Sequence, residues 1–385
     1  MNNSYHPFDL RKLAKNPLPN CQFLLHQPSG LISSEIAPFF AKQDESTDLD
    51  QLTKIFTSEY CHPEIYTVII DNVCVTPKCK GLARYWGIFW DNYYAFNFIN
   101  NDAKQRFAKS GEFTIDEHNE VITVDLATKN KVHFSGTSVW LYPFNNLDHL
   151  LRECLPGLLT LKEMNADFNQ LNFIVNEASS DTLEFLKALS IPKESIISIN
   201  NRWLSFDKLI IPCFGSFGHL HTPSHYYNDI ATHIVRSLPS QSPLKEINKR
   251  IYVSRRNASV RRILNESSLY EGLTARGFTI IEPGDYAKIR QVELFRDAEI
   301  IIGPHGMGIA NAIFTENLKL LVEIMQTDWN RVSYFRTAQL KHAHYGAYYV
   351  EPLSDSYHSH KTISRDILID LNKFFLFLDN LLMPH

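Results

Sequence analysis

The segment Glu299-Ile-Ile-Ile-Gly-Pro-His-Gly-Met-Gly-Ile-Ala-Asn311 decides the fold of the second half of this chain. An apolar run ends at Gly303, a loop with three glycines and one histidine follows, and residues 310–314 can begin a helix. The start of a helix presents unpaired backbone N–H groups and the positive end of the helix dipole, both of which favour a phosphate. The segment therefore predicts a ligand of nucleotide type whose diphosphate is held without a metal.

The sequence around this segment alternates strands with helices. Asn265 can cap the first helix, and Gly277 suits the left-handed residue that ends it. Short apolar strands alternating with helices predict a parallel sheet covered on both faces, a Rossmann-like domain whose ligand lies at the C-terminal ends of the strands. The predicted strands are 250–254, 278–282, 300–303 and 319–324, and the predicted helices are 265–276, 287–297 and one from about 308.

The first half shows a weaker form of the same alternation, which predicts a second Rossmann-like domain. The Pro- and Ser-rich stretch 237–243 is the best candidate linker, so the expected domains are 1–240 and 241–385, with the last helix packed on either one. Residues 1–60 are poorly patterned, and no structure is assigned to them. The predicted strands are 65–70, 121–124, 139–142, 171–175, 196–199 and 208–211, and the predicted helices are 146–162 and 181–189.

Composition excludes several classes of protein. The 385 residues are 44% hydrophobic and carry a net charge of −4, which suits a chain with a large core and gives no sign of nucleic-acid binding. The six cysteines are scattered, as in a reduced cytoplasmic protein. No signal peptide or membrane span is apparent. The apolar stretch 374–382 is expected to be a buried helix, with peripheral contact to an inner membrane as the alternative.

Six cations crowd the first strand of the second domain. Arg255 and Arg256 follow the C-terminal end of that strand, where ligands of parallel sheets bind, and Arg261 lies close behind. Guanidinium groups suit phosphate oxygens because their donors form a planar fork. The alternative is a solvated face on which Arg262 pairs with Glu266.

Four further residues belong to the same expected site. Gly306 and Gly308 permit close approach of the backbone, and His305 can donate to a phosphate oxygen. Asn311 can bond a phosphate or simply cap the helix. The carboxylate of Glu323 interrupts an apolar strand, where it can accept hydrogen bonds from a ribose or from neighbouring backbone N–H groups.

The order of these motifs resembles the C-terminal half of glycosyltransferase family 61. The resemblance covers residues 250 to 350 and rests on the combination of 254–256, 261–266, 277–278, 291–298, 303–311 and 322–324. It implies a GT-B-like α/β fold of two facing Rossmann-like domains, an inverting mechanism and a nucleoside-diphosphate sugar, commonly of UDP, with no metal or other cofactor. By the same likeness the arginines and the His305 loop hold the diphosphate, and Glu323 holds the ribose.

The stretch 145–156 resembles the motif of that family's N-terminal domain, a histidine followed by an acidic residue before a Leu-Pro pair. His149 and Glu153 are four residues apart and share one face of a helix. An inverting transferase needs one base to take the proton of the acceptor hydroxyl. Either residue can be that base, with Asp148 as a weaker third candidate and an ordinary helix pair as the alternative.

The sequence thus predicts a hexosyl- or pentosyltransferase of bacterial capsule or other surface polysaccharide assembly. Its expected partners are a nucleotide-sugar donor and a glycan or lipid-linked glycan acceptor. Asp48-Leu-Asp50 has the form of a metal motif but follows no strand, and the histidine pairs 219/221, 342/344 and 358/360 lack companion ligands. Two rivals remain, a non-catalytic nucleotide-binding module and a dinucleotide-dependent oxidoreductase; the latter lacks Gly-x-Gly-x-x-Gly after any strand.

Overall fold

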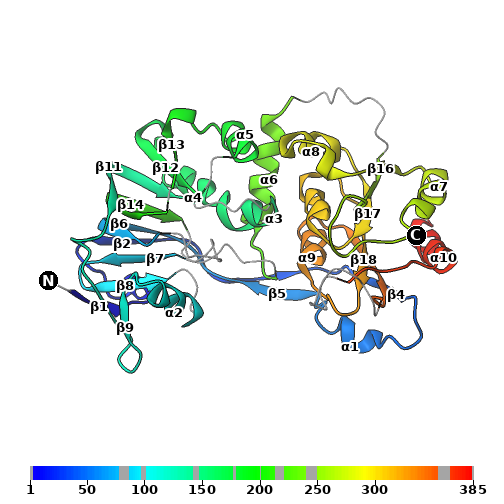
Figure 1. Cartoon of the computed structure of the whole chain (residues 1–385). Coiled ribbons are helices and arrows are strands. Elements are labelled where there is room, and N and C mark those ends of the chain that lie inside the picture. Colours follow the sequence, from blue (N-terminus) through cyan, green and yellow to red (C-terminus); the bar gives the residue numbers. More distant parts are fainter. Residues whose placement is uncertain are drawn as a thin grey trace. The chain divides into compact units, whose positions relative to one another are not determined.

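The computed structural model describes residues 3–77, 86–96, 101–141, 147–176, 179–199, 201–212, 221–239, 249–353 and 365–383. The chain divides into two compact units, whose elements are labelled in Figure 1. Unit 1 consists of Met1–Gly30, Pro63–Asn145 and His149–His219, and unit 2 of Leu31–His62, Asn146–Asp148 and Leu220–His385. Residues 31–62 and 220–239 therefore go with unit 2, whereas the sequence-based boundary at residue 240 put them in the first domain.

Unit 2 is built on a six-stranded sheet in the order β16-β15-β17-β18-β19-β4, in which all neighbouring strands are parallel. The strands are β4 (Phe39–Lys42), β15 (Arg250–Val253), β16 (Thr279–Ile281), β17 (Ile300–Pro304), β18 (Leu320–Gln326) and β19 (His344–Val350). Strands β3 (Gly30–Ser33) and β5 (Glu59–His62) form a separate pair. The helices are α1 (Leu49–Thr53), α6 (His225–Ser237), α7 (Ser267–Ala275), η5 (Pro283–Asp285), α8 (Lys288–Phe295), η6 (Met307–Phe314), α9 (Ser333–Leu340) and α10 (Leu371–Leu382).

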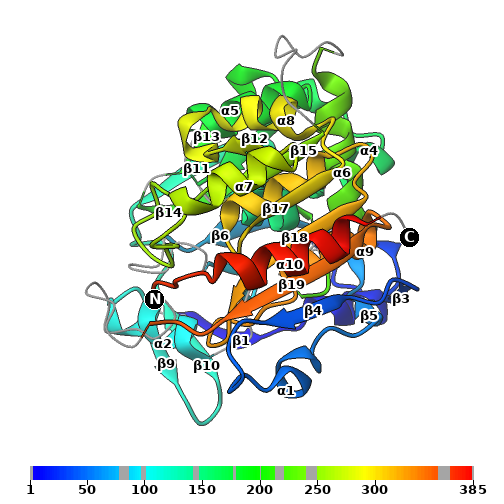
Figure 2. The same cartoon turned by 90° about the vertical axis from the view of Figure 1, so that its right-hand side faces the viewer.

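Helices cover both faces of this sheet, because successive side chains of each strand point to opposite sides. Ile301 and Leu321 pack in one core with residues of α8, η6 and α9. Ile302 and Val322, their neighbours in sequence, pack in the other core with residues of α7 and α10. Figure 2 shows α10 crossing in front of β18 and β19. The apolar C-terminal stretch is therefore a helix that packs on unit 2.

Three local predictions for unit 2 can be compared with the structure. Gly277 has a φ of +78° directly after α7, so its role as the left-handed stop is confirmed. Asn265 does not cap that helix with its side chain, which exchanges two hydrogen bonds with the backbone of Ile369 instead. The helix expected from residue 308 is the 3-10 helix η6, which begins at Met307.

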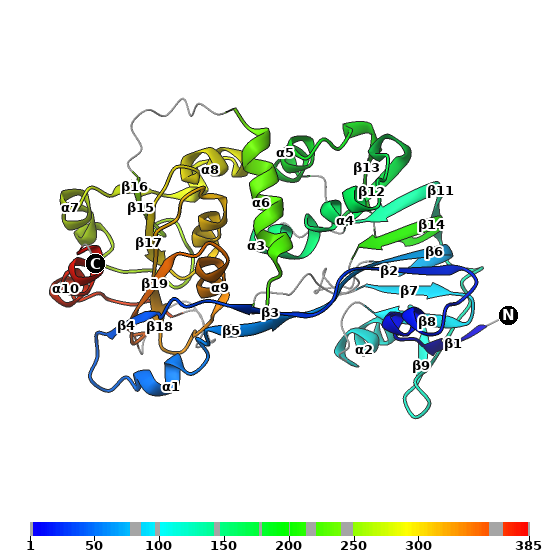
Figure 3. The ribbon, with the colours of Figure 1, turned by 180° about the vertical axis from the view of Figure 1, so that it is seen from behind.

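Unit 1 contains a mixed sheet, part of which Figure 3 shows with β2, β6, β7 and β14 side by side. Its order is β13-β12-β11-β14-β6-β7-β8-β1-β10-β9, with β2 also paired to β6. Strands β13, β12, β11 and β14 run parallel, β6 joins them antiparallel, and β1 pairs parallel with β8 further along the sheet. The α/β class is thus confirmed, but a doubly covered parallel sheet is found in unit 2 alone.

The elements of unit 1 include strands in the N-terminal stretch to which no structure was assigned. The strands are β1 (Asn3–Pro7), β2 (Cys21–Gln27), β6 (Ile65–Val75), β7 (Gly87–Trp90), β8 (Tyr93–Phe96), β9 (Thr114–Asp116), β10 (Val121–Val124), β11 (Lys131–Trp140), β12 (Leu171–Val175), β13 (Ile196–Ser198) and β14 (Trp203–Pro212). The helices are η1 (Leu10–Ala14), α2 (Asn101–Lys109), α3 (Leu147–His149, shared with unit 2), η2 (Leu150–Cys154), α4 (Gly157–Glu163), η3 (Phe168–Gln170), α5 (Ser180–Ala188) and η4 (Lys193–Ser195). Within the residues that the structure covers, no helix is long and apolar enough to cross a membrane.

Candidate functional site

The strand order of unit 2 identifies one edge of the sheet as the place for a ligand. Numbered along the chain from β15, the five strands β16-β15-β17-β18-β19 lie in the order 2-1-3-4-5, so the direction of the connections reverses between β15 and β17. In open parallel sheets ligands bind beyond the carboxyl ends of the strands at this switch point. Arg255 and His305 follow these two strands, so the topology brings their loops together.

Arg255 lies directly against the glycine loop. A Cβ atom placed on Gly306 would be 1.9 Å from Nη1 of Arg255, so only glycine leaves room for this guanidinium. The backbone N–H of Arg255 donates to Glu266 Oε1 at 2.9 Å, and its Nη2 donates to the carbonyl oxygen of Val260 at 3.1 Å. Both the loop and the side chain are therefore held in place before any ligand arrives.

Arg255 and Arg261 form a positively charged pair for which the described part of the chain supplies no carboxylate partner. Among the described residues neither forms an ion pair with a carboxylate, and the buried Nε of each has no hydrogen-bond acceptor. Burial lowers the pKa of both guanidinium groups, and the charge of Arg255 lowers that of Arg261 further. Arg261 also has a φ of +55°, which costs a residue with a side chain about 1 kcal/mol. A bound anion would relieve the repulsion and satisfy the buried donors.

His305 is tied to Glu323 through the register of two adjacent strands. Gly303 lies opposite Glu323 in the β17–β18 ladder, which brings His305 Nδ1 to 2.7 Å from Glu323 Oε1. Tyr345 donates its hydroxyl to the other carboxylate oxygen at 2.6 Å, and burial, followed by the charge of Glu323, raises the pKa of this tyrosine. The side chain of Glu323 is 0% exposed. Glu323 therefore orients the His305 ring, and the ribose contact expected of it stays a prediction.

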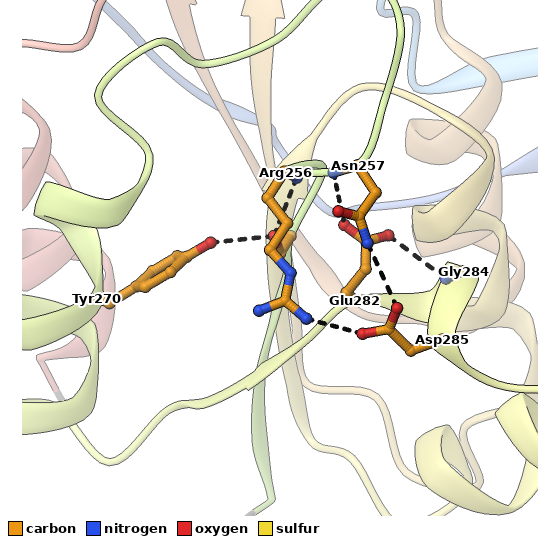
Figure 4. Close-up of polar contacts among 7 residues, drawn as sticks. Arg256, Asn257, Tyr270, Glu282, Gly284 and Asp285 are labelled. Atoms are coloured by element: carbon orange, nitrogen blue, oxygen red, sulfur yellow. Dashed lines mark hydrogen bonds and ion pairs between the residues drawn. The ribbon is translucent and has the colours of Figure 1, made fainter.

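Arg256 has a different setting from its neighbour Arg255. Its Nη2 donates to Asp285 Oδ2 at 2.7 Å, as Figure 4 shows. The side chain of Arg256 is 53% exposed. Asn257 joins the group by donating to the other oxygen of Asp285 at 3.3 Å. A diphosphate contact from Arg256 would have to compete with this ion pair. Arg262 is paired as well, but with Asp366 at 2.6 Å and not with Glu266.

Asn311 and Gly308 hold the glycine loop against the rest of unit 2. A Cβ atom on Gly308 would lie 2.7 Å from Val253 Cγ1, so this glycine allows the loop to pack against β15. Asn311 is fully buried and donates to Gln291 Oε1 at 2.8 Å and to the carbonyl oxygen of Gly308 at 3.0 Å. The structure thus makes Asn311 a brace of the loop; it does not cap a helix.

His149 and Glu153 form a hydrogen-bonded dyad in unit 1. Their atoms Nδ1 and Oε1 are 3.0 Å apart, and the side chains are 21% and 6% exposed, respectively. Residues Leu150–Cys154 form a π-helix in which the N–H of Leu155 donates to the carbonyl of Leu150 at 2.9 Å. Single π-helical turns occur frequently at functional sites. The carboxylate holds Nδ1, so the other ring nitrogen is the one that can accept a proton.

The structure adds aromatic and cationic residues that the sequence did not reveal. Tyr334 lies with its ring centroid 5.2 Å from that of His305, and its phenol is close enough to affect the pKa of both Arg255 and Arg261. Trp329 lies under the guanidinium of Arg261, 5.2 Å from Cζ to the ring centroid. Both aromatic residues follow β18 at the carboxyl edge of the sheet. Their position after a predicted strand of the sheet was the one feature of the sequence that could have pointed to them.

The sequence offered Asp48-Leu-Asp50 and three histidine pairs as possible metal ligands. Within the described ranges no group of three or more His, Cys, Asp or Glu side chains could hold a metal ion. Asp48 instead caps α1, accepting the N–H of Gln51 at 3.1 Å. The pair 358/360 and one member of the pair 219/221 lie outside the described residues.

A protein-family model matches the middle of the chain. The model of the family described as Glycosyltransferase 61 matches residues 147–322, a range that begins just before His149 and ends one residue before Glu323. A search of curated proteins finds no match. The matched range contains the dyad of unit 1 and the arginines and glycine loop of unit 2. The chain therefore carries a domain of glycosyltransferase family 61, and the protein is a glycosyltransferase.

Proposed function

We propose that this glycosyltransferase uses a nucleoside-diphosphate sugar, with UDP as the first nucleotide to test, and that it inverts the configuration of the transferred sugar. The observation that carries this proposal is the pair Arg255 and Arg261 at the switch point, two half-buried arginines with a buried Nε each and no carboxylate partner among the described residues, of which Arg255 lies against Gly306. Buried charges are stable only when they are paired, and a diphosphate supplies the missing charge.

The reaction is a single displacement at the anomeric carbon. An acceptor hydroxyl oxygen attacks that carbon while its proton passes to the base, and the bond from the carbon to the diphosphate oxygen breaks. The departing oxygen keeps the electron pair, so negative charge grows on the diphosphate. Arg255 and Arg261 would stabilise this charge together with the loop N–H groups. Because Nδ1–H of His305 is bound to Glu323, this ring adds a donor at Nε2 only when it carries both protons.

His149 is the proposed base, and Glu153 is the residue that positions it. Glu153 Oε1 lies 3.0 Å from Nδ1 of the ring, so Nε2 is the nitrogen that would take the proton. Glu153 is itself mostly buried, which makes it a poor candidate for direct contact with an acceptor. Asp148 is buried in the described structure and is not needed for this step.

The proposal includes independence from metals and other cofactors. Arg255, Arg261 and His305 would supply the charge stabilisation that a divalent cation supplies elsewhere. We therefore expect turnover to be unchanged by excess EDTA. A loss of activity that Mg²⁺ or Mn²⁺ restores would refute this part.

For the acceptor we propose a glycan or lipid-linked glycan of bacterial surface polysaccharide assembly, such as a capsule. The support is the resemblance of residues 250–350 to the bacterial members of the family. Contact with the cytoplasmic side of the inner membrane is part of this proposal, because α10 exposes Leu376 by 66% and Met383 follows it exposed. Sedimentation with anionic lipid vesicles tests that contact, and Leu376→Ser should weaken it.

Calorimetry followed by a hydrolysis assay tests the proposed donor. We expect UDP to bind, and the UDP-sugar that binds best to be hydrolysed slowly in the absence of acceptor. Arg255→Gln should weaken binding about 10- to 150-fold, whereas Arg276→Gln, which removes an ion pair with Asp379, should leave it intact. Binding without turnover of any sugar would favour a non-catalytic nucleotide module, and binding of NAD would favour the oxidoreductase.

A further inference from the structure

Directly after β18, a third arginine joins the pair in unit 2. Cζ of Arg331 lies 4.3 Å from the ring centroid of Trp329, and Cζ of Arg261 lies 5.2 Å from the same centroid. One indole ring therefore links Arg331 to the proposed diphosphate site. The three residues come from two loops at the carboxyl edge of the sheet, the loop after β15 and the loop after β18.

Like Arg255 and Arg261, Arg331 has no carboxylate partner within the described part of the chain. Its Nη1 donates to the carbonyl oxygen of its neighbour Asn330 at 2.8 Å. The nearby carboxylates are engaged elsewhere: Asp328 pairs with Arg365 at 2.8 Å, and Glu323 binds His305 and Tyr345. Trp329 adds one more donor, a buried Nε1–H without an acceptor.

The guanidinium groups of several other arginines in unit 2 are already engaged. A carboxylate neutralises Arg256, Arg262, Arg276 and Arg365. Arg336 lies over the ring of Tyr60 without a carboxylate partner among the described residues, but it donates to Thr57, His221 and Gln339. Stacking on an aromatic ring orients a guanidinium without neutralising it, so its N–H fork stays available for an anion. Arg255 and Arg261 match the charge of a diphosphate, and Arg331 is in excess of that requirement.

We propose that Arg331, held on Trp329, binds a second anionic group of the substrates, a carboxylate or phosphate ester carried by a sugar. The inference rests on the proposed function, since it takes the diphosphate to occupy Arg255 and Arg261. The transferase would then act on glycans that carry acidic groups. The acidic group belongs either to the donor sugar, as in a uronic acid, or to the acceptor.

Matched pairs of ligands separate these two sources. In the donor arm, calorimetry compares UDP-glucuronate with UDP-glucose and UDP-galacturonate with UDP-galactose. In the acceptor arm, the UDP-loaded protein is titrated with a hyaluronan tetrasaccharide and with chitotetraose. Each titration is done with the wild type, Arg331→Gln, Arg331→Lys and the control Arg276→Gln, whose arginine pairs with Asp379 between α7 and α10.

We expect the wild type to bind the acidic member of at least one pair about tenfold more tightly, the contribution of a hydrogen bond between charged groups. Arg331→Gln should remove this preference and leave the affinity for UDP within about twofold of the wild type. Arg331→Lys should keep part of the preference, because the charge remains but the planar fork is lost. Arg276→Gln should behave as the wild type.

Three results would overturn the inference. The first is a wild type that binds UDP but prefers no acidic ligand in either arm. The second is an Arg331→Gln variant that keeps the preference. The third is equal weakening of both members of a pair together with UDP, which would mean that Arg331 only supports Trp329. A wild type that binds no nucleoside diphosphate refutes the proposed function itself, and the inference then falls with it.

Discussion

A single methyl group on Gly306 should displace the guanidinium of Arg255. The Cβ atom of Gly306→Ala would lie 1.9 Å from Nη1, whereas ordinary van der Waals contact begins at 3.4 Å, so the group must move by the difference, about 1.5 Å. The obstructing atom is the far end of a flexible side chain. We therefore expect the fold to tolerate the change, with less than about 1 kcal/mol lost from the free energy of unfolding.

The affinity for the nucleotide should fall much more than the stability. A displacement of this size breaks the hydrogen bond from Arg255 to a phosphate oxygen, and such bonds between charged groups contribute about 1.5–3 kcal/mol. The dissociation constant for UDP should then rise about 10- to 150-fold. Calorimetry measures this constant, and a thermal melt confirms that the variant is folded.

Two further variants make the test specific to Arg255. Gly284→Ala is the matched control, since its Cβ atom would make an ordinary contact at 3.5 Å with Glu282 Oε1. In an Arg255→Ala background, Gly306→Ala should have almost no further effect, because the group that it displaces is gone. If Gly306→Ala weakens UDP binding equally in both backgrounds, the reasoning through Arg255 is refuted.

Three other predictions address the dyad, the buried carboxylate and a buried lysine. His149→Asn should lower kcat by about 10²- to 10⁴-fold and leave the affinity for UDP unchanged. Glu153→Gln should shift the pH profile of kcat. Unchanged turnover in both variants would exclude the dyad as the base. Glu323→Gln should destabilise the protein by about 1–3 kcal/mol and weaken UDP binding, because it impairs the carboxylate bonds to His305 and Tyr345. Tyr345→Phe keeps the bond between Glu323 and His305. It should therefore lower stability in a denaturant titration and leave UDP binding unchanged. Burial lowers the pKa of Lys341 from 10.5 to about 8. Between pH 8 and 9.5 the unfolded chain therefore binds more protons than the folded protein, and the free energy of unfolding should rise with pH by up to about 2 kcal/mol. Urea titrations should show this rise in the wild type and not in Lys341→Met.

Local signals in the sequence were enough to predict the part of unit 2 from β15 to β18, with its helices α7, α8 and η6, and the C-terminal helix α10, but not α6, α9 or β19. Its strands are short and apolar because both faces are covered, and the positions of the helices follow from the periodicity between them. The spacing of His149 and Glu153 also predicted their contact correctly, since i and i+4 share a helix face. The π-helical turn between them was not predicted, because nothing in the side-chain pattern distinguishes it from an α-helix.

These local signals could not predict which distant segments pair with one another. The polar N-terminal stretch gave no reason to expect β4, which extends the parallel sheet by pairing with β19. The mixed sheet of unit 1 was missed for a similar reason, because the direction of a strand depends on its partner and leaves little trace in its own residues.

The sequence by itself determined the class of the fold, the position of the glycine loop and the presence of a cationic group beside it. Only the tertiary structure showed which of these cations pair with a carboxylate and which do not. Arg255 and Arg256 are adjacent in the chain, yet one lies on Gly306 without a carboxylate partner in the described structure and the other pairs with Asp285. The same holds for Glu323, whose partners His305 and Tyr345 come from the two neighbouring strands of the sheet. Whether a charged side chain binds a ligand or another side chain depends on which charges the fold brings near it, and strand register and topology decide that.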